Sequence, residues 1–221
     1  MSFPSVRAVL FDLDGTLADT APDLGGAVNR MRVRRGLEPL PIALLRPVAS
    51  AGARGMLGVG FAMRPDMDGY EPLREEFLAE YEAALDRDTV LFDGVADCLA
   101  ALDARGLRWG VVTNKATRFT GPVLAGLGLA ADVVICGDTT PHAKPHPAPL
   151  LEACQRLGVA AGEAIYVGDD LRDVQAARAA CMPSVAAGYG YLGESPDLAA
   201  WGADAVIDTP MALLELLAGQ R

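Results

Sequence analysis

Cysteine, positive charge and long apolar runs are all scarce in this chain of 221 residues, and each scarcity argues against a class of protein. The four cysteines show no CxxC spacing and sit among Ala, Leu or Val: Cys98, Cys136, Cys154 and Cys181. We therefore expect buried, reduced thiols and a reducing cytoplasm. No apolar run approaches the ~20 residues of a membrane span. Acidic residues interrupt the N-terminal apolar segment, so no signal peptide is indicated.

Basic residues are outnumbered, since 19 Lys and Arg face 29 Asp and Glu and the formal net charge is −10. This balance argues against nucleic acid and anionic membranes as partners, because both attract basic patches. An acidic protein that acts on an anionic substrate needs local cations, so magnesium, Lys and Arg are the groups to look for. The hydrophobic content of 51% supports a full core, and the length allows one α/β domain plus a smaller module.

The hydrophobic pattern predicts a parallel sheet with helices on both faces. Short apolar or β-branched stretches, interpreted as strands, lie at 6–11, 109–113, 133–136, 164–167, 184–187 and 205–207. Predicted helices alternate with the later strands, at 95–105, 117–126, 147–157 and 171–180. That alternation is typical of a doubly wound α/β domain.

The segment from 22 to 88 breaks the alternation, because its pattern is helical and contains no convincing strand. We predict helices at 23–35 and 73–85, with a small-residue loop at 49–55 that leads into another helix. The predicted fold is therefore α/β, a Rossmann-like doubly wound parallel sheet with a small helical cap domain inserted after the first strand. The predicted boundaries are 1–18 and 89–221 for the discontinuous core domain and 19–88 for the cap.

The most informative motif, Asp12-Leu13-Asp14-Gly15-Thr16, directly follows the first strand. Two carboxylates two residues apart leave a strand end on the same side. Burying both is unfavourable unless a metal or a proton offsets their charge. The alternative interpretation is an acidic strand-to-helix turn in which Asp or Thr caps a helix.

Three further polar groups follow predicted strands or lie in the loops after them: Thr113-Asn114-Lys115, Lys144-Pro145 and Gly168-Asp169-Asp170-Leu171-Arg172-Asp173. In parallel sheets, functional groups collect at the carboxyl ends of the strands. Carboxylates, a hydroxyl, a lysine and glycine-rich turns suit a metal-held phosphate. Taken singly, the threonine could be a helix N-cap and the lysine of the Lys-Pro pair a solvated side chain.

In this order, the four motifs resemble those of the haloacid dehalogenase superfamily of phosphatases, and the resemblance covers nearly the whole chain. The helical insert resembles the small helical cap of that superfamily. Within it, the chain is most similar to phosphoglycolate-phosphatase-like enzymes. Residues 50–56, 109–115 and 168–173 resemble still more closely the N-acetylmuramic acid 6-phosphate phosphatases of bacterial cell-wall recycling.

The resemblance implies that Asp12 is the nucleophile and that Asp14 protonates the leaving alkoxide and then deprotonates the attacking water. It also implies Mg²⁺ bound by Asp12, the backbone carbonyl of Asp14 and Asp169. Asp173, one helical turn further on, either binds the metal or orients a water.

For the substrate, the resemblance implies that the Thr113 hydroxyl and the backbone amides of the Asn114 turn hold phosphate oxygens. Lys144 supplies a cation against the developing charge. Arg54, on the only glycine-rich cap loop, is predicted to bind a substrate carboxylate. The expected reaction is magnesium-dependent hydrolysis of a small carboxylate-bearing phosphate ester through an aspartyl phosphate. N-acetylmuramate 6-phosphate is preferred over 2-phosphoglycolate, and the oligomeric state is left open.

Some residues near the motifs permit several interpretations. Asp170 is interpreted first as a helix N-cap, then as a group that supports the metal ligands, then as an extra ligand. Lys115 is expected on the surface, and Asp19 and Thr20 are expected to begin the cap linker. His142 and His146 flank Lys144, and a catalytic role for them is not expected, because the chemistry needs no histidine.

Other functions are weighed against hydrolysis. A hexose-phosphate mutase of the same superfamily would need a cap that holds a bisphosphate, and only one cap cation loop, at Arg54, is evident. A receiver-type signalling domain would keep its acidic pair and its phospho-acceptor on separate strands and would lack the helical insert. An inactive scaffold is disfavoured, since no expected catalytic position is missing.

Overall fold

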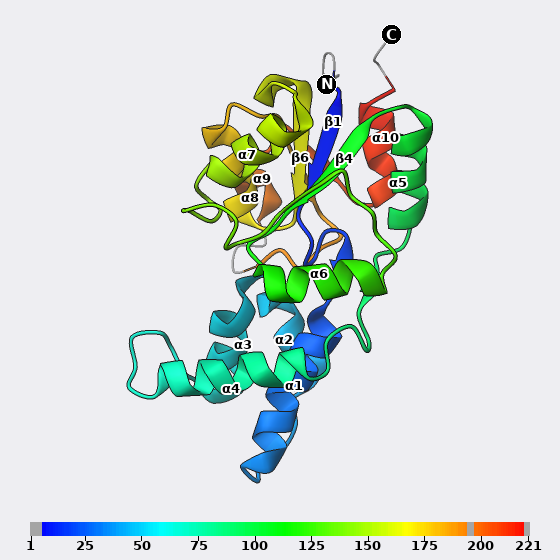
Figure 1. The fold of residues 1–221 in the computed structure, drawn as a ribbon. Coiled ribbons are helices and arrows are strands. Elements are labelled where there is room, and N and C mark those ends of the chain that lie inside the picture. The colour runs from blue at the N-terminus through cyan, green and yellow to red at the C-terminus, as the bar shows by residue number, and fades with distance from the viewer. Residues whose placement is uncertain (1–5, 194–196, 219–221) are drawn as a thin grey trace.

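The computed structural model describes residues 6–193 and 197–218 of the chain. At its centre lies a parallel six-stranded sheet with the strand order β5-β4-β1-β6-β7-β8 (Figure 1). Its strands are β1 Ala8–Phe11, β4 Arg108–Val112, β5 Val133–Ile135, β6 Ala164–Gly168, β7 Ser184–Ala187 and β8 Ala205–Ile207. The sheet predicted from the sequence is confirmed, and each strand begins and ends within two residues of its predicted position.

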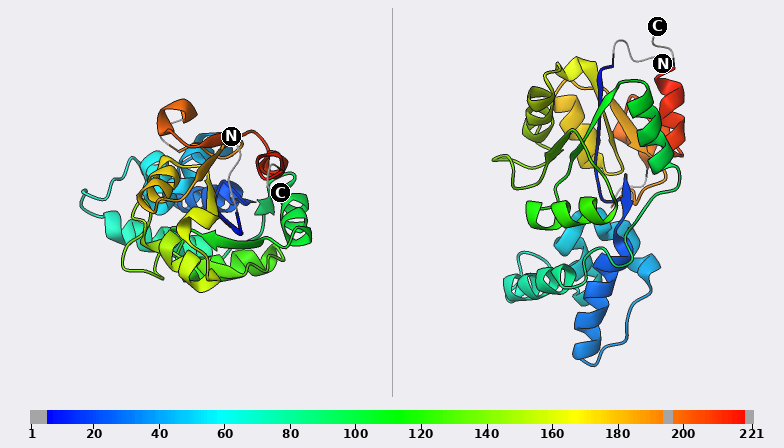
Figure 2. Two further views of the ribbon diagram at one scale, coloured as in Figure 1. Left: turned by 90° about the horizontal axis from the view of Figure 1, so that it is seen from above. Right: turned by 45° about the vertical axis from the view of Figure 1, so that its right-hand side comes forward.

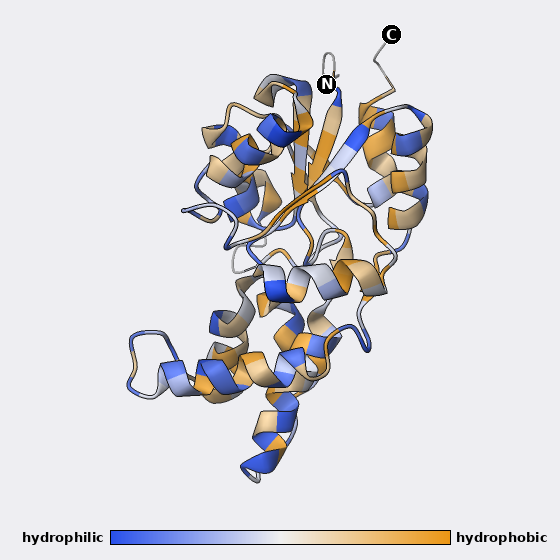
Figure 3. Ribbon diagram, in the orientation of Figure 1, coloured by the Kyte–Doolittle hydropathy of each residue, from blue (hydrophilic) through white to orange (hydrophobic). Residues whose placement is uncertain are grey.

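Both faces of the sheet are covered because its strands are apolar on both sides. In β1, Val9 and Phe11 pack into one hydrophobic cluster with residues of α5 and α10, whereas Ala8 and Leu10 pack into another with residues of α7 and α8. Figure 2 shows these helices on opposite sides of the sheet, and Figure 3 shows the mostly hydrophobic strands between them. The helices of this part are α5 Val95–Ala104, α6 Thr117–Gly126, α7 Ala148–Leu157, α8 Leu171–Ala179, α9 Leu198–Trp201 and α10 Leu213–Leu216.

A helical insert follows β1 and lies against the carboxyl ends of the strands (Figure 1). It has its own hydrophobic cluster, which includes Met31, Leu57 and Phe77. Its elements are α1 Ala21–Arg34, α2 Ile42–Leu45, the 3-10 helix Arg46–Ala51, α3 Gly52–Phe61 and α4 Tyr70–Glu82. Two short antiparallel strands, β2 Ala18–Asp19 and β3 Val90–Leu91, join the insert to the sheet. They were not predicted, because strands of two residues leave no hydrophobic period to detect.

The small-residue loop expected at 49–55 is largely helical. The 3-10 helix ends at Ala51 and α3 begins at Gly52, so Arg54 lies in the first turn of a helix and not on a loop. Gly52 has φ +56°, a backbone conformation that glycine adopts without strain, and this lets the chain change direction between the two helices. Small side chains alone did not distinguish this sharp helix junction from a loop.

Three of the four cysteines are buried, as expected, but Cys181 is exposed. Cys181 follows α8 in the left-handed conformation, with φ +54°, at a turn where its side chain projects from the surface. Its apolar sequence neighbours were therefore a poor guide to its environment. In the described ranges, no helix is long and apolar enough to cross a membrane.

Candidate active site

Three of the predicted motifs follow strands that are neighbours in the sheet. Asp12 follows β1, Thr113 follows β4 and Asp169 follows β6, and β1 lies between the other two strands. In the strand register, Phe11 pairs with Val111 on one side and with Val167 on the other. Because the strands are parallel, the residues just beyond these pairs meet at one edge of the sheet.

Three carboxylates form a buried cluster at this edge: Asp12, Asp169 and Asp173 each offer an oxygen within 4.8 Å of the other two. Burial and the neighbouring charges of Asp12 and Asp173 raise the pKa of Asp169 well above its usual value. Burial likewise raises the pKa of Asp173 to about 6, although the Lys144 ammonium opposes the rise. The cluster therefore carries more negative charge than the protein groups around it neutralise.

Gly15 and three hydrogen-bond donors fix the position of Asp169. A Cβ on Gly15 would lie 2.1 Å from an Asp169 oxygen, so no larger residue fits there, and its φ of +89° also favours glycine. Thr16 donates its hydroxyl hydrogen to Asp169 at 2.8 Å, and the Tyr191 amide donates at 3.0 Å. The hydroxyl of Ser50, in the helical insert, donates to the same carboxylate at 3.2 Å. The insert thus contacts a residue of the acidic cluster directly.

Lys144 is the cation of this cluster, and its side chain is only 2% exposed. Its ammonium lies 3.0 Å from Asp12 and 2.7 Å from Asp173, and it also donates to the Val112 carbonyl and the Tyr166 hydroxyl. Burial lowers the pKa of Lys144, but the two carboxylates outweigh that effect and raise it. A charged ammonium therefore faces the predicted nucleophile.

Asn114 positions Lys144. Its side-chain amide donates to the Lys144 carbonyl at 2.9 Å and its amide oxygen accepts from the Lys144 N–H at 2.8 Å. The Thr113 hydroxyl oxygen accepts from the Lys115 N–H at 3.1 Å, which closes the turn after β4. The Asn114 side chain is thus engaged in holding the lysine loop.

Asp14, the second carboxylate of the first motif, lies beside Asp12 in sequence but has different partners. The Thr20 hydroxyl and the Lys115 ammonium both donate to its Oδ1, the latter at 2.8 Å. Thr20 therefore does more than begin the linker to the insert, because it contacts the predicted acid–base group. These contacts leave Asp14 outside the cluster of three carboxylates.

The expectation that Lys115 lies on the surface is wrong. Its side chain is 6% exposed and its ammonium lies 4.8 Å from the centre of the Tyr81 ring, which packs in turn against Phe119. The ion pair with Asp14 compensates for burial of the charge. A signal was present in the sequence: Lys115 stands two residues after Thr113, in the turn that follows a strand end, and it is one of only two lysines among 19 basic residues.

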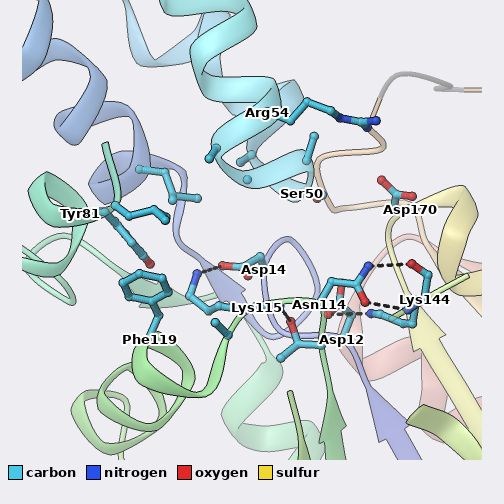
Figure 4. Close-up of a pocket in the computed structure, with 18 of the residues that line it drawn as sticks. Asp12, Asp14, Ser50, Arg54, Tyr81, Asn114, Lys115, Phe119, Lys144 and Asp170 are labelled. Carbon is cyan, nitrogen blue, oxygen red and sulfur yellow. Dashed lines mark hydrogen bonds and ion pairs between the residues drawn. The ribbon is translucent and has the colours of Figure 1, made fainter. Parts of the chain in front are cut away.

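A cavity of about 360 Å³ lies between this edge of the sheet and the helical insert (Figure 4). Six cationic side chains line it: Arg54, Arg74, Lys115, Arg118, Lys144 and Arg172. In a protein with a net charge of −10, this concentration of cations favours an anionic ligand. Besides Arg54, the helical insert contributes Arg74 of α4 to the same cavity, a cation that a search for cationic loops did not find.

Asp170 is a helix N-cap, the first of its predicted roles. Its carboxylate accepts from the Arg172 N–H at the start of α8, and the Asp173 carboxylate accepts from the Asp170 N–H. The Arg172 side chain pairs with Asp170 at 2.8 Å and donates to the Ser50 carbonyl at 2.9 Å. Arg172, for which the motif alone predicts no role, therefore connects the insert to the edge of the sheet.

The comparison with protein families agrees with this geometry, because residues 6–180 match the model of the haloacid dehalogenase-like hydrolases. The chain belongs to that family. It is 50% identical over 217 residues to a phosphoglycolate phosphatase of Xanthomonas campestris pv. campestris, covering 97% of both chains. It is also 43% identical to an N-acetylmuramic acid 6-phosphate phosphatase of Pseudomonas aeruginosa, covering 96% of this chain and 95% of the other.

A solved structure is similar over the same length. The crystal structure of a predicted phosphoglycolate phosphatase from Haemophilus somnus aligns with a TM-score of 0.81 at 27% identity, covering 96% of this chain and 98% of that one. The predicted fold class and family are thereby confirmed. The oxygen donors of the acidic cluster suit Mg²⁺, which prefers carboxylate and water ligands. A bound cation would also neutralise the repulsion among the buried carboxylates that raises the pKa of Asp169.

Proposed function

We propose that this hydrolase cleaves a small, carboxylate-bearing phosphate monoester in a magnesium-dependent reaction. The observation that carries the proposal is the pairing of Asp12 and Asp14 at one strand end. One carboxylate belongs to a buried acidic cluster and the other faces a cation-lined cavity. Two carboxylates in such different surroundings can perform two different steps.

Asp12 is the nucleophile. The Leu13 N–H and the Lys144 ammonium both contact its Oδ1, so Oδ2 is the oxygen that attacks phosphorus. The bond from phosphorus to the ester oxygen breaks as the bond to Asp12 forms, which leaves an aspartyl phosphate. The ammonium contact disperses negative charge and fixes the side chain for attack.

Asp14 manages the protons. It donates a proton to the departing alkoxide in the first step and takes one from water in the second, when water attacks the aspartyl phosphate and releases inorganic phosphate. The Thr20 hydroxyl and the Lys115 ammonium hold its carboxylate in a fixed orientation at the cavity wall. Thr113 and the backbone amides of the Asn114 turn bind the oxygens of the transferred phosphoryl group.

Asp12, Asp169 and Asp173 are the side chains that would hold Mg²⁺, together with the backbone carbonyl of Asp14. The bound cation would neutralise phosphoryl charge and orient the ester for in-line attack. Asp173 is paired with Lys144 in this structure, and it either binds the cation directly or holds a ligating water. The Lys144 ammonium neutralises part of the remaining negative charge of the site.

The substrate candidates are 2-phosphoglycolate and N-acetylmuramate 6-phosphate, which are named in the relatives' activities. Both carry a carboxylate, and the surplus of cations in the cavity supports that choice. Arg54, on the α3 side of the cavity, is proposed to bind the carboxylate of a large substrate such as the muramate. With that substrate, the protein would serve cell-wall recycling in the cytoplasm.

The proposed core domain and cap have different roles in the reaction. The core domain, 1–18 and 89–221, carries the reacting carboxylates, and the cap, 19–88, closes the cavity over them. We do not favour a mutase, because the nearly full-length relatives reported above are named phosphatases. A receiver domain is disfavoured by the helical insert and by the placement of both carboxylates directly after β1.

The test is phosphate release by the purified protein from p-nitrophenyl phosphate, 2-phosphoglycolate and N-acetylmuramate 6-phosphate, after chelation and after Mg²⁺ is restored. We expect turnover only with Mg²⁺, and none in the Asp12→Asn variant. No phosphate release from any of the three esters would overturn the proposal, and full activity after chelation would overturn the role of the metal.

A further inference from the structure

The hydroxyl of Tyr81 is the one buried side-chain polar atom, within residues 6–193 and 197–218, for which no hydrogen-bond partner is found. Tyr81 is 2% exposed and lines the cavity. The polar group beside its hydroxyl is the Lys115 ammonium, which can only donate, so the hydroxyl hydrogen has no acceptor among the described residues. A buried hydroxyl hydrogen without an acceptor is unfavourable, and an anionic ligand in the cavity would supply the missing acceptor.

Lys115 lies beside this hydroxyl. Its ammonium is 4.8 Å from the centre of the Tyr81 ring, and Figure 4 shows both groups on the side of the cavity that Asp14 occupies. An ammonium has three N–H donors, of which Asp14 accepts one. The chain uses only two lysines, and the other, Lys144, faces the predicted nucleophile.

Resting on the proposed function, we infer that Lys115 and Tyr81 form a subsite for a carboxylate carried on the same carbon as the ester oxygen. Two hydrogen-bond donors, one charged and one neutral, converge there on an anion the size of a carboxylate. The preferred substrate class is then a 2-phosphooxy acid, of which 2-phosphoglycolate is the smallest member.

The position of Asp14 supports this class. If Asp14 protonates the ester oxygen, that oxygen lies within hydrogen-bond reach of its carboxylate, and the Lys115 ammonium is 2.8 Å from the same carboxylate. In a 2-phosphooxy acid, the carboxyl carbon lies about 2.5 Å from the ester oxygen at ordinary bond lengths and angles. In N-acetylmuramate 6-phosphate, about seven bonds separate the carboxyl carbon from the ester oxygen, so the carboxylate is not held beside that oxygen.

Arg54 serves a different region. Figure 4 places its guanidinium well apart from Lys115 and nearer to Asp170. A carboxylate close to the ester oxygen would therefore meet Lys115, whereas Arg54 could meet only a more distant anionic group. The two cations thus separate the two candidate substrates.

The experiment compares kcat/KM for 2-phosphoglycolate with kcat/KM for ethyl phosphate, the same ester with a methyl group in place of the carboxylate. We expect wild type to prefer 2-phosphoglycolate. Tyr81→Phe, which keeps the aromatic ring and removes only the hydroxyl, should reduce that preference about tenfold, and Lys115→Met about a hundredfold. Because Lys115→Met also removes a partner of Asp14, the ratio between the substrates is the readout and not the absolute rate.

Tyr70→Phe is the matched control, since Tyr70 lies on the same helix and lines the same cavity. It should leave the ratio unchanged. An unchanged ratio in both Tyr81→Phe and Lys115→Met would overturn the subsite while leaving the phosphatase intact. A larger fall of the ratio in Arg54→Ala than in Lys115→Met would also overturn it. Failure of wild type to hydrolyse any phosphate ester would instead refute the proposed function.

Discussion

Asp169 allows a sharp test of the charge imbalance in the acidic cluster, through the change Asp169→Asn in the metal-free protein. An aspartate in the unfolded chain titrates near pH 4. In the folded protein the pKa of Asp169 is well above that value, because of burial and of the charges of Asp12 and Asp173. Between the two pKa values the folded state keeps a proton that the unfolded state has lost.

The sign of the effect follows from this difference. As the pH rises from about 4 toward the folded-state pKa, the free energy of unfolding of wild type falls by about 1.4 kcal/mol per pH unit on account of this group. Asparagine does not titrate, so the variant lacks this contribution. The stability of the variant relative to wild type therefore grows with pH over that window.

The contacts of Asp169 set the expected size of the stability difference between the variant and wild type. Carboxylate oxygens that lie no more than 4.8 Å apart repel by about 3.5 kcal/mol or more at an effective dielectric constant of about 20. Against this, Asp169 accepts hydrogen bonds on both oxygens, from Thr16, Ser50 and Tyr191, and asparagine keeps only one acceptor oxygen. The lost bond costs about 1–3 kcal/mol. We expect the variant to be the less stable protein near pH 5 and the more stable one, by about 1–3 kcal/mol, near pH 8.

Urea unfolding in the presence of EDTA, at several values between pH 5 and pH 8, measures this crossover. Asp103→Asn, at an exposed position of α5, is the control and should show no crossover. Added Mg²⁺ should stabilise wild type at pH 8 and have much less effect on Asp169→Asn, since metal binding adds to the stability of the state that binds it. A difference between variant and wild type that stays constant with pH in EDTA would refute the reasoning.

Other residues of the site give further expectations. Asp12→Asn should abolish turnover while the circular dichroism spectrum stays that of wild type, because the amide keeps the shape and loses the nucleophile; near-wild-type kcat would contradict its role. Asp14→Asn should lower kcat by roughly 10²–10⁴-fold for an alkyl phosphate and by less for an aryl phosphate, whose leaving group needs little proton transfer. Equal losses on the two esters would argue against Asp14 as the acid. Asn114→Ala removes both hydrogen bonds to the Lys144 backbone and should lower kcat and also destabilise the protein by about 1–3 kcal/mol. Unchanged activity and an unchanged urea midpoint would show that the Lys144 loop holds its place unaided.

Local pattern was enough to predict the sheet. The alternation in β1, where Ala8 and Leu10 face one cluster and Val9 and Phe11 the other, is visible in the sequence because strand side chains alternate with a period of two. The N-cap role of Asp170 was likewise predictable, since a cap depends only on residues in the first turn of its own helix. The same reasoning missed β2 and β3, whose pairing joins residues 18–19 to 90–91, far apart in the chain.

Asp12, Asp14 and Asp169 could be placed together from the sequence because each follows an apolar strand, and parallel strands bring their carboxyl ends to one edge. Their roles, and that of Asp173 in α8, came from the resemblance to a known family. The burial and the ion pairs of the charged residues around them, Lys115 and Arg172, were decided only by the tertiary structure. Lys115 was expected on the surface, but the ring of Tyr81 from α4 lies over its ammonium, and Phe119 packs against that ring. Arg172 reaches the Ser50 carbonyl over a separation of 122 residues. Burial and pairing of a charge depend on groups distant in the chain, and no local period records them.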